Sequence, residues 1–302
     1  MSGPIRVGTR RSPLARVQTD WVISRLADRA PDLRFVATPI DTSGDRDRTV
    51  GGSPDFTDAI DRALLRGTVE LAVHSAKDLP ATLDRRFELL ACPRRADARD
   101  CLVLAPDRRV ARLPRGARVG SSSLRRRAQL LRWRTDLRVT EIRGNVGTRI
   151  DLVRSGAVDA TILAVAGVSR LRRTREIGRI LPASSFVPAP AQGALAVVAR
   201  AGDSGLASVV RGIDHAATRE CITAERTFAA ALGGDCRLPL GALATRHDRR
   251  LSLVGEVLAP DGRTTLRLHR SGSASGAAGL GSKMGQEMLD RGALDLMSPS
   301  RV

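Results

Sequence analysis

The sequence is poor in lysine and in aromatic side chains. Lysine and arginine together number 50, but only Lys77 and Lys283 are lysines, and tyrosine is absent. Aromatic residues make up 2% of the chain, so the core must be built mainly from leucine, valine, isoleucine and alanine. This shortage also argues against single-stranded nucleic acid as a ligand, because such strands are bound by stacking of bases on aromatic rings.

Long apolar runs and closely spaced cysteines are absent as well. Without a run of about 18 apolar residues we expect no membrane-spanning helix, and the first residues lack the apolar stretch of a secretory signal. The four cysteines, Cys92, Cys101, Cys221 and Cys236, show no Cys-x-x-Cys spacing. We therefore expect neither a metal site nor a disulfide framework, and thiols of this kind suit the cytoplasm.

The formal net charge of +18 leaves three explanations open. A strongly basic chain can bind nucleic acid, bind a small polyanionic substrate, or expose a solvated, arginine-rich surface. The near absence of lysine favours the solvated surface for at least half of the arginines, because it indicates a general preference for arginine. The charge alone does not choose among the three.

A chain of 302 residues is too long for a single hydrophobic core, so we expect two or three domains. In its first two thirds, expected strands alternate with expected helices, and two successive segments share the plan of strand, polar turn and helix. This alternation predicts parallel or mixed α/β sheets. The expected strands cover 5–9, 33–40, 69–73, 118–120, 137–142 and 160–165. Helices are expected from Ser12, over 56–65, from Ser123 and from the run 143–149.

The pattern changes from about Thr218. A helix over 218–232 is followed by three strands joined by short turns and a last helix over 277–291. Consecutive strands with short connections predict a small antiparallel α+β domain. The three strands are expected at 238–244, 251–258 and 264–269.

Lys77 and Asp78 follow directly after the strand expected at 69–73, close to His74. The carboxyl ends of strands are where α/β proteins bind their ligands. Arginine-rich surroundings favour the charged form of Asp78, which could accept N–H groups of a ligand or stabilise positive charge that develops in a reaction. The alternative is a structural salt bridge to Lys77 or an arginine, and His74 could equally be a core histidine.

Three polar turns stand where helices are expected to begin, at 9–12, 121–127 and 143–149. A helix N-terminus offers free N–H groups and a positive dipole, and hydroxyl and guanidinium groups beside it bind carboxylate or phosphate. A capped helix with solvated arginines explains any one of these turns. Three of them on two similar lobes predict an arginine-lined cleft between two domains, suited to a ligand with many anionic groups.

Cys236 lies in a glycine-rich loop after the helix expected at 218–232. Small neighbours allow a bulky group to approach its thiol. The alternative is a buried, unreactive cysteine.

These segments together resemble the porphobilinogen deaminase, or hydroxymethylbilane synthase, family. The shared runs occur in the family's order from the N-terminus to Gly241, and the last sixty residues match only loosely. The ordered set is far more specific than any single run. The runs are 9–15 (TRRSPLA), 72–80 (AVHSAKDLP), 120–126 (GSSSLRR), 143–149 (RGNVGTR), 164–167 (AVAG), 188–194 (PAPAQGA) and 223–226 (TAER).

The resemblance implies three domains: 1–92 with 193–210, 93–192, and 211–302. The first two resemble periplasmic binding proteins with the active site between them, and the third carries a cysteine bonded by a thioether to a dipyrromethane cofactor. The implied activity condenses four porphobilinogen molecules head to tail onto this primer with loss of ammonia, and water then releases linear hydroxymethylbilane. Each pyrrole carries an acetate and a propionate, which accounts for the arginines.

The resemblance also assigns residues. Asp78 is the implied catalytic carboxylate, which holds pyrrole N–H groups and stabilises a cationic azafulvene intermediate, and Cys236 is the implied point of cofactor attachment. The implied cofactor-binding residues are Lys77, Asp78, Ser121, Ser122, Ser123, Arg125 and Arg126. The implied substrate-binding residues are Arg10, Ser12, Phe56, Arg143, Arg149, Arg170 and Gln192. We expect no metal, no nucleic acid or membrane partner, and a monomer.

The chain departs from the family pattern in three places. The loop around 42–57 is short, and Asp55 and Asp58 put negative charge where an anionic substrate should pass. Asp235 stands where glycine is common, and Val198 where glutamate is usual. These departures motivate an alternative, a non-catalytic relative that binds pyrroles or other polyanions.

Overall fold

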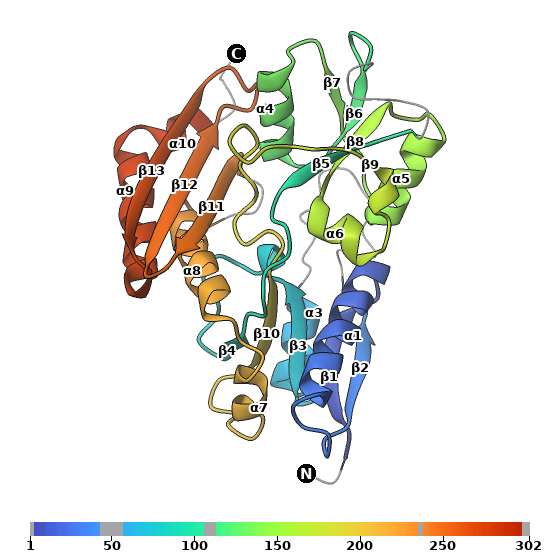
Figure 1. Ribbon diagram of the computed structural model, residues 1–302, viewed down its shortest axis with the longest axis vertical. Coiled ribbons are helices and arrows are strands. Elements are labelled where there is room, and N and C mark those ends of the chain that lie inside the picture. Colours follow the sequence, from blue (N-terminus) through green and yellow to red (C-terminus); the bar gives the residue numbers. More distant parts are fainter. Residues whose placement is uncertain (1–2, 43–56, 106–112, 235–237, 298–302) are drawn as a thin grey trace. The chain divides into compact units, whose positions relative to one another are not determined.

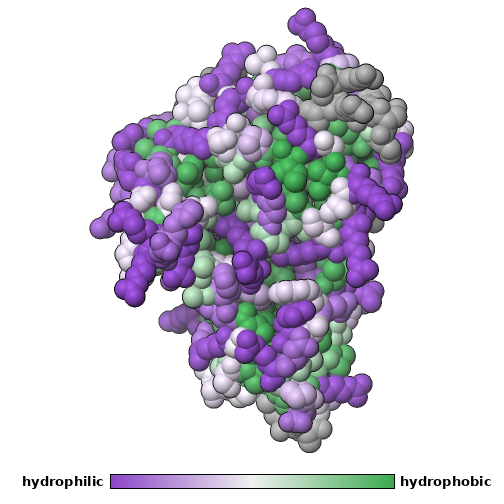
Figure 2. Space-filling model, in the orientation of Figure 1, coloured by the Kyte–Doolittle hydropathy of each residue, from purple (hydrophilic) through white to green (hydrophobic). Residues whose placement is uncertain are grey.

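The computed structural model describes residues 3–42, 57–105, 113–234 and 238–297 (Figure 1). None of the helices in these ranges is both long and apolar enough to cross a membrane. Hydrophilic side chains are spread over the face shown in Figure 2, with hydrophobic ones in small patches between them. Many arginines are exposed, among them Arg11, Arg16, Arg25 and Arg29, so much of the positive charge belongs to a solvated surface.

The chain forms two compact units, which we describe in turn. The first contains Met1–Leu79, Leu83–Arg95 and Ala194–Arg219. The second contains Pro80–Thr82, Ala96–Gly193 and Glu220–Val302.

The first unit is built on a five-stranded mixed sheet. Strands β2, β1 and β3 run parallel, and β10 is antiparallel to both β3 and β4. In spatial order the strands are β2 (Phe35–Ile40), β1 (Ile5–Arg10), β3 (Leu71–Ser75), β10 (Leu195–Arg200) and β4 (Phe87–Ala91).

Helices cover both faces of this sheet. Val7 of β1 belongs to a core cluster with residues of α1 (Pro13–Ala27) and α7 (Ala207–Arg211). Gly8 points to the opposite face, because successive residues of a strand alternate. There a side chain at Gly8 would meet Ile60 of α3 (Asp58–Leu65) at 3.4 Å.

The second unit repeats this plan. Strands β7, β6 and β8 are parallel, and β5 is antiparallel to β8 and β9. The order therefore corresponds strand for strand to that of the first sheet. It is β7 (Arg138–Thr140), β6 (Arg118–Gly120), β8 (Ala160–Ala164), β5 (Asp100–Leu104) and β9 (Ile177–Ile180).

Helices again pack on both faces. Leu102 of β5 lies in a core cluster with Leu130 of α4 (Leu124–Trp133), whereas Cys101 lies in another with residues of α5 (Val146–Arg154). The short helix α6 (Val165–Arg170) follows β8 directly.

An antiparallel three-stranded sheet completes the second unit. Phe228 of α8 and Met284 of α9 both approach Gly255, where a Cβ atom would come within 2.6 Å of each. A glycine is therefore required at this point of the packing. The elements are α8 (Ala216–Ala231), β11 (Leu240–His247), β12 (Arg250–Leu258), β13 (Thr265–Ser273), α9 (Ala277–Asp290) and α10 (Ala293–Met297).

The predicted α/β class and the antiparallel C-terminal domain are confirmed, and the predicted elements lie within a few residues of their observed bounds. Strands β4, β5, β9 and β10 have no predicted counterpart. The three-domain division stays a prediction. Val198, the departure from the family's glutamate, is buried in β10 between β3 and β4, where an apolar side chain fits.

Candidate functional site

The first group of predicted site residues lies at one edge of the first unit's sheet. Arg10 ends β1, and the 3-10 turn η1 (Ala76–Asp78) follows β3. Because β1 and β3 are parallel neighbours, their carboxyl ends meet at the same edge. Arg10, Lys77 and Asp78 therefore stand at the edge where the sequence places chemistry.

Helix α1 contributes Ser12 to the same edge. Ser12 is the N-cap, and its Oγ accepts the backbone N–H of Ala15 at 3.3 Å, ahead of Pro13 at the first helical position. Gln18, one turn further, donates from Nε2 to Oγ of Ser75 at 3.0 Å. This hydrogen bond ties the first turns of α1 to the end of β3.

His74 is a core residue and faces away from solvent. Its side chain is buried, and its Nε2 has no hydrogen-bond partner among the described residues. Burial, with the positive charge of Arg10 as a smaller cause, lowers the pKa of His74 to about 4. The imidazole is therefore neutral at pH 7, as expected for a core histidine.

His74 should make stability depend on pH. In the unfolded chain it takes up a proton near pH 6.5, whereas the folded protein resists protonation until about pH 4. The free energy of unfolding should therefore fall as the pH falls through this window, by on the order of 3 kcal/mol. Denaturant unfolding at several pH values should show a flatter profile for His74→Leu. An unchanged slope in that variant, matching the control His247→Asn at an exposed histidine, would contradict this.

The second group lies at the corresponding edge of the second unit's sheet. Ser121, Ser122 and Ser123 follow β6, Arg143 follows β7, and Arg170 ends the helix that follows β8. Strands β7, β6 and β8 are parallel, so their carboxyl ends share one edge.

The serines make the turn that opens α4. Ser123 is its N-cap and accepts the N–H of Arg126 at 3.4 Å, and Oγ of Ser121 accepts the N–H of Ser123 at 3.2 Å. The Oγ of Ser122 is approached by Nη2 of Arg149 at 3.3 Å. The turns after β6 and β7 are thus joined.

This edge has an excess of positive charge. Burial lowers the pKa of Arg149 to about 10, with Arg126 and Arg143 as further causes, and burial alone lowers that of Arg170 to about 10. Within the described ranges, Arg149 and Arg170 donate to serine and peptide oxygens rather than to carboxylates. Arg143 pairs with Glu141 at 2.6 Å, yet its buried Nε lacks a described partner. The group has the donors and the charge to bind carboxylates.

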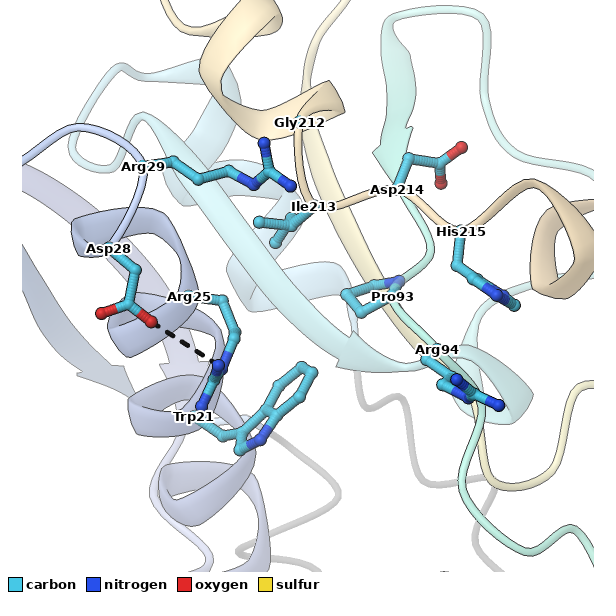
Figure 3. Close-up of a pocket in the computed structure, with 10 residues that line it drawn as sticks. All are labelled: Trp21, Arg25, Asp28, Arg29, Pro93, Arg94, Gly212, Ile213, Asp214 and His215. Atoms are coloured by element: carbon cyan, nitrogen blue, oxygen red, sulfur yellow. Dashed lines mark ion pairs between the residues drawn. The ribbon is translucent and has the colours of Figure 1, made fainter.

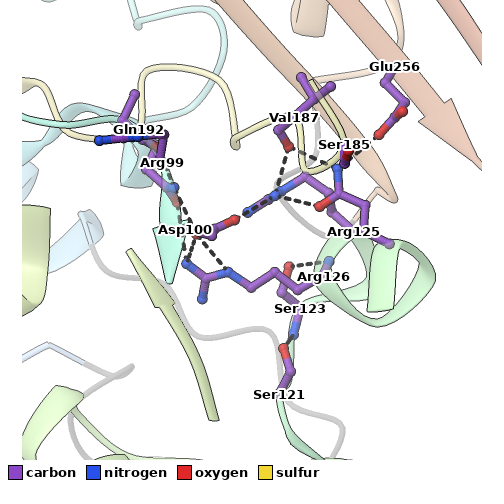
Figure 4. A network of polar contacts seen from close by, with 12 residues as sticks. Arg99, Asp100, Ser121, Ser123, Arg125, Arg126, Ser185, Val187, Gln192 and Glu256 are labelled. Carbon is purple, nitrogen blue, oxygen red and sulfur yellow. Dashed lines mark hydrogen bonds and ion pairs between the residues drawn. The ribbon is translucent and has the colours of Figure 1, made fainter. Parts of the chain in front are cut away.

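Arg125 and Arg126 belong to a buried polar network (Figure 4). Both pair with the buried carboxylate of Asp100, at 2.9 and 2.7 Å. Gln192 is fully buried and donates from Nε2 to Oδ1 of Asp100 at 2.9 Å and to the carbonyl of Ala98 at 2.7 Å. The cofactor role of the two arginines and the substrate role of Gln192 stay predictions.

Three buried carboxylates were not among the predicted residues. Asp100 begins a strand, Glu256 lies within one, and Glu225 lies in the TAER run. Glu225 accepts the backbone N–H groups of Ala191 and Ala244 at 2.6 and 2.7 Å. For Asp100 and Glu256 the sequence offered one signal, because each is a charged residue beside an apolar run. A charge in such a place indicates a buried, paired group.

Two predicted residues, Phe56 and Cys236, lie outside the described residues, as do Asp55 and Asp235. Asp58 begins α3, and its carboxylate pairs with Arg62 one turn further on.

The other cysteines, Cys92, Cys101 and Cys221, are buried. Burial raises the pKa of Cys101 to about 12, so its thiol is unreactive at neutral pH.

The first unit also has a pocket of about 560 Å³. Figure 3 shows Trp21, Arg25, Arg29 and Pro93 around it, with His215 from the segment before α8. Trp21, Arg25 and Arg29 come from the second half of α1 and its C-terminal end, whereas Ser12 caps its N-terminus. None of the predicted site residues lines this pocket.

The fold and the two groups define a class of protein. It has two α/β sheets of matching strand order, each with anion-binding side chains at the carboxyl edge of its parallel strands, as suits a ligand with several carboxylates. Residues 5–208 match the family model "Porphobilinogen deaminase, dipyromethane cofactor binding domain", and residues 219–290 match "Porphobilinogen deaminase, C-terminal domain". The chain belongs to the porphobilinogen deaminase family.

Relatives named porphobilinogen deaminase match over nearly the whole chain. That of Roseiflexus castenholzii is 46% identical, covering 99% of this chain and 100% of the relative. That of Desulforudis audaxviator is 40% identical, covering 100% and 99%, and that of Deinococcus radiodurans is 39% identical, covering 98% and 99%.

Similar solved structures include an ancestral arginine-binding protein bound to arginine, 17% identical, covering 70% of this chain and 91% of that chain with a TM-score of 0.40. A putative methionine-binding lipoprotein from Bacillus subtilis is 10% identical, covers 70% and 89%, and has a TM-score of 0.44. Similarity at this level does not establish the fold, which is defined here by the sheets themselves.

The chain is therefore a transferase that makes linear hydroxymethylbilane from four porphobilinogen molecules, with a dipyrromethane cofactor as the primer. The alternative of a non-catalytic relative is not favoured. The residues at the start of α4 fit such a cofactor. Two guanidinium groups there, Arg125 and Arg126, share the single carboxylate of Asp100, so positive charge is left for the carboxylates of a dipyrromethane.

Proposed function

We propose that each of the two groups supplies residues both for the substrate and for the cofactor. Arg143, Arg149 and Arg170, with Arg10 and Ser12 of the first unit, bind the acetate and propionate of the incoming porphobilinogen. Ser121, Ser122, Ser123, Arg125 and Arg126, with Lys77, hold the carboxylates of the dipyrromethane. The observation that supports this assignment most is that the described hydrogen bonds of Arg149 and Arg170 go to serine and peptide oxygens and not to carboxylates.

Asp78 is the proposed catalytic residue. When porphobilinogen loses ammonia, its methylene carbon becomes electron-poor, and the positive charge spreads onto the pyrrole N–H. A carboxylate that accepts this N–H lowers the energy of the transition state more than that of the substrate, because the charge is larger there. The place of Asp78 on η1, directly after a buried strand, holds it on a rigid support.

Cys236 is the proposed attachment point of the cofactor, which primes chain growth when bound. Phe56 and Gln192 are proposed to contact substrate. We further propose that the enzyme acts as a monomer in the cytoplasm, without a nucleic-acid or membrane partner.

Arg149→Gln should weaken substrate binding. Its guanidinium donates to Ser122 and Gly144 and retains a positive charge for a substrate carboxylate. Loss of one charge-assisted hydrogen bond should raise KM for porphobilinogen by about 10- to 100-fold. Initial rates over a range of porphobilinogen concentrations measure this change.

Arg154→Gln is the matched control. Arg154 ends the same helix, is half-exposed and pairs with Glu176 at 2.6 Å. We expect its KM to stay at the wild-type value. Equal KM in all three proteins would show that Arg149 does not bind substrate.

A further inference from the structure

Asp100 is a fully buried carboxylate that serves both adjacent arginines of α4. Its Oδ2 accepts Nη1 of Arg125 at 2.9 Å, and its Oδ1 accepts Nη2 and Nε of Arg126 at 2.7 and 3.2 Å. Nε2 of Gln192 donates to the same Oδ1 at 2.9 Å. Burial by itself would raise the pKa of Asp100, but the two guanidinium groups hold it well below the usual range.

The contacts use one side of each guanidinium fork. Nη1 of Arg125 also donates to Gln129 and to the carbonyl of Val187, at 2.9 and 2.8 Å. Among the described residues, no partner is found for Nε and Nη2 of Arg125 or for Nη1 of Arg126. The carboxylate of Asp100 thus holds the guanidinium groups of Arg125 and Arg126. Each of these groups keeps N–H donors for a second carboxylate.

A second buried carboxylate, Glu256, is linked to Arg125 through Gln129, whose Oε1 accepts Nη1 of Arg125. Gln129 donates from Nε2 to Glu256 of β12 at 2.9 Å, and Arg132 pairs with the same buried carboxylate at 2.6 Å. Glu256 makes no described hydrogen bond to Arg125 or Arg126. The two buried carboxylates therefore differ: Asp100 pairs directly with both arginines, whereas Glu256 reaches Arg125 only through Gln129.

We propose that Asp100 is a positioning residue for cofactor loading. It anchors the forks of Arg125 and Arg126 so that their remaining N–H groups are preset for a carboxylate of the dipyrromethane. A preset donor loses little side-chain entropy when the ligand arrives. The inference rests on the proposed cofactor role of these two arginines.

The test is the rate at which cofactor-free protein becomes covalently loaded when porphobilinogen is added, followed by intact mass. Asp100→Asn keeps the shape of the side chain and removes its charge, and we expect loading to slow by about 10- to 100-fold, as for the loss of a charge-assisted hydrogen bond. Glu256→Gln removes an equally buried carboxylate. It should lower stability and load at the wild-type rate.

A double variant separates positioning from general destabilisation. If Asp100 acts through Arg125 and Arg126, Asp100→Asn should slow loading less in the Arg126→Gln background than in the wild type, because only Arg125 is then left to be positioned. Slowing by the product of the two single effects would overturn the inference. Wild-type loading of Asp100→Asn, with slow loading of Arg126→Gln, would overturn it and leave the proposed function standing.

Two further outcomes are also decisive. Wild-type loading of both Arg125→Gln and Arg126→Gln would overturn the proposed cofactor role and the inference with it. If Asp100→Asn does not fold, Asp100→Glu takes its place, because it keeps the charge and moves the carboxylate by one methylene group relative to the two guanidinium groups. Loading slowed several-fold in Asp100→Glu supports the inference, and wild-type loading overturns it.

Discussion

Asp78→Asn is expected to lower kcat by about 100- to 1,000-fold, the effect of removing one preorganised group that stabilises transition-state charge. The substitution keeps the size of the side chain and its ability to accept a hydrogen bond, and it removes the negative charge. Because the positive charge is largest in the transition state, kcat should fall much more than KM rises. Steady-state formation of hydroxymethylbilane measures both quantities.

Asp84→Asn is the control for this prediction. Asp84 lies six residues further along, is exposed, and pairs with Arg86 at 2.7 Å. Its replacement should leave kcat and KM unchanged. A kcat for Asp78→Asn within a few-fold of wild type would show that Asp78 is not the catalytic carboxylate.

Cys236→Ala is expected to abolish turnover. Without the thiol, the dipyrromethane has no covalent attachment, so the cationic side chains of the second unit have no primer to hold. The variant should remain folded, because the change removes a single sulfur atom. Product formation and thermal unfolding measure the two effects.

Cys101→Ala and Cys221→Ala provide the comparison. Both thiols are buried, and the raised pKa of Cys101 makes it a poor nucleophile. These variants should lose some stability through the cavity left behind and retain turnover. Turnover by Cys236→Ala at the wild-type rate would place the cofactor on another residue.

The helix-opening turns could be predicted because they depend on neighbours in the sequence. Ser12 followed by Pro13 is a local signal, and the structure places the serine hydroxyl on the N–H of Ala15. Ser123 and Asn145 cap their helices in the same way. The place of Asp78 followed from the buried strand before it.

The buried network could not be predicted from the sequence. Asp100 is separated by 25 residues in sequence from Arg125 and by 92 from Gln192, and only the folded second unit brings the three together. For the same reason β10 has no predicted counterpart, since it pairs with β3 and β4 after the whole second sheet has intervened. Short apolar runs such as these fit a strand or a buried helix turn equally well.

The most direct test of the account is the intact mass of the purified protein before and after porphobilinogen is added, with Cys236→Ala beside it. We predict a covalent increment of two pyrrole units on the wild type, absent from the variant. Porphobilinogen should then add mass in steps of one pyrrole unit, each a porphobilinogen less ammonia. A wild-type mass without the increment, unchanged by porphobilinogen, would contradict the account.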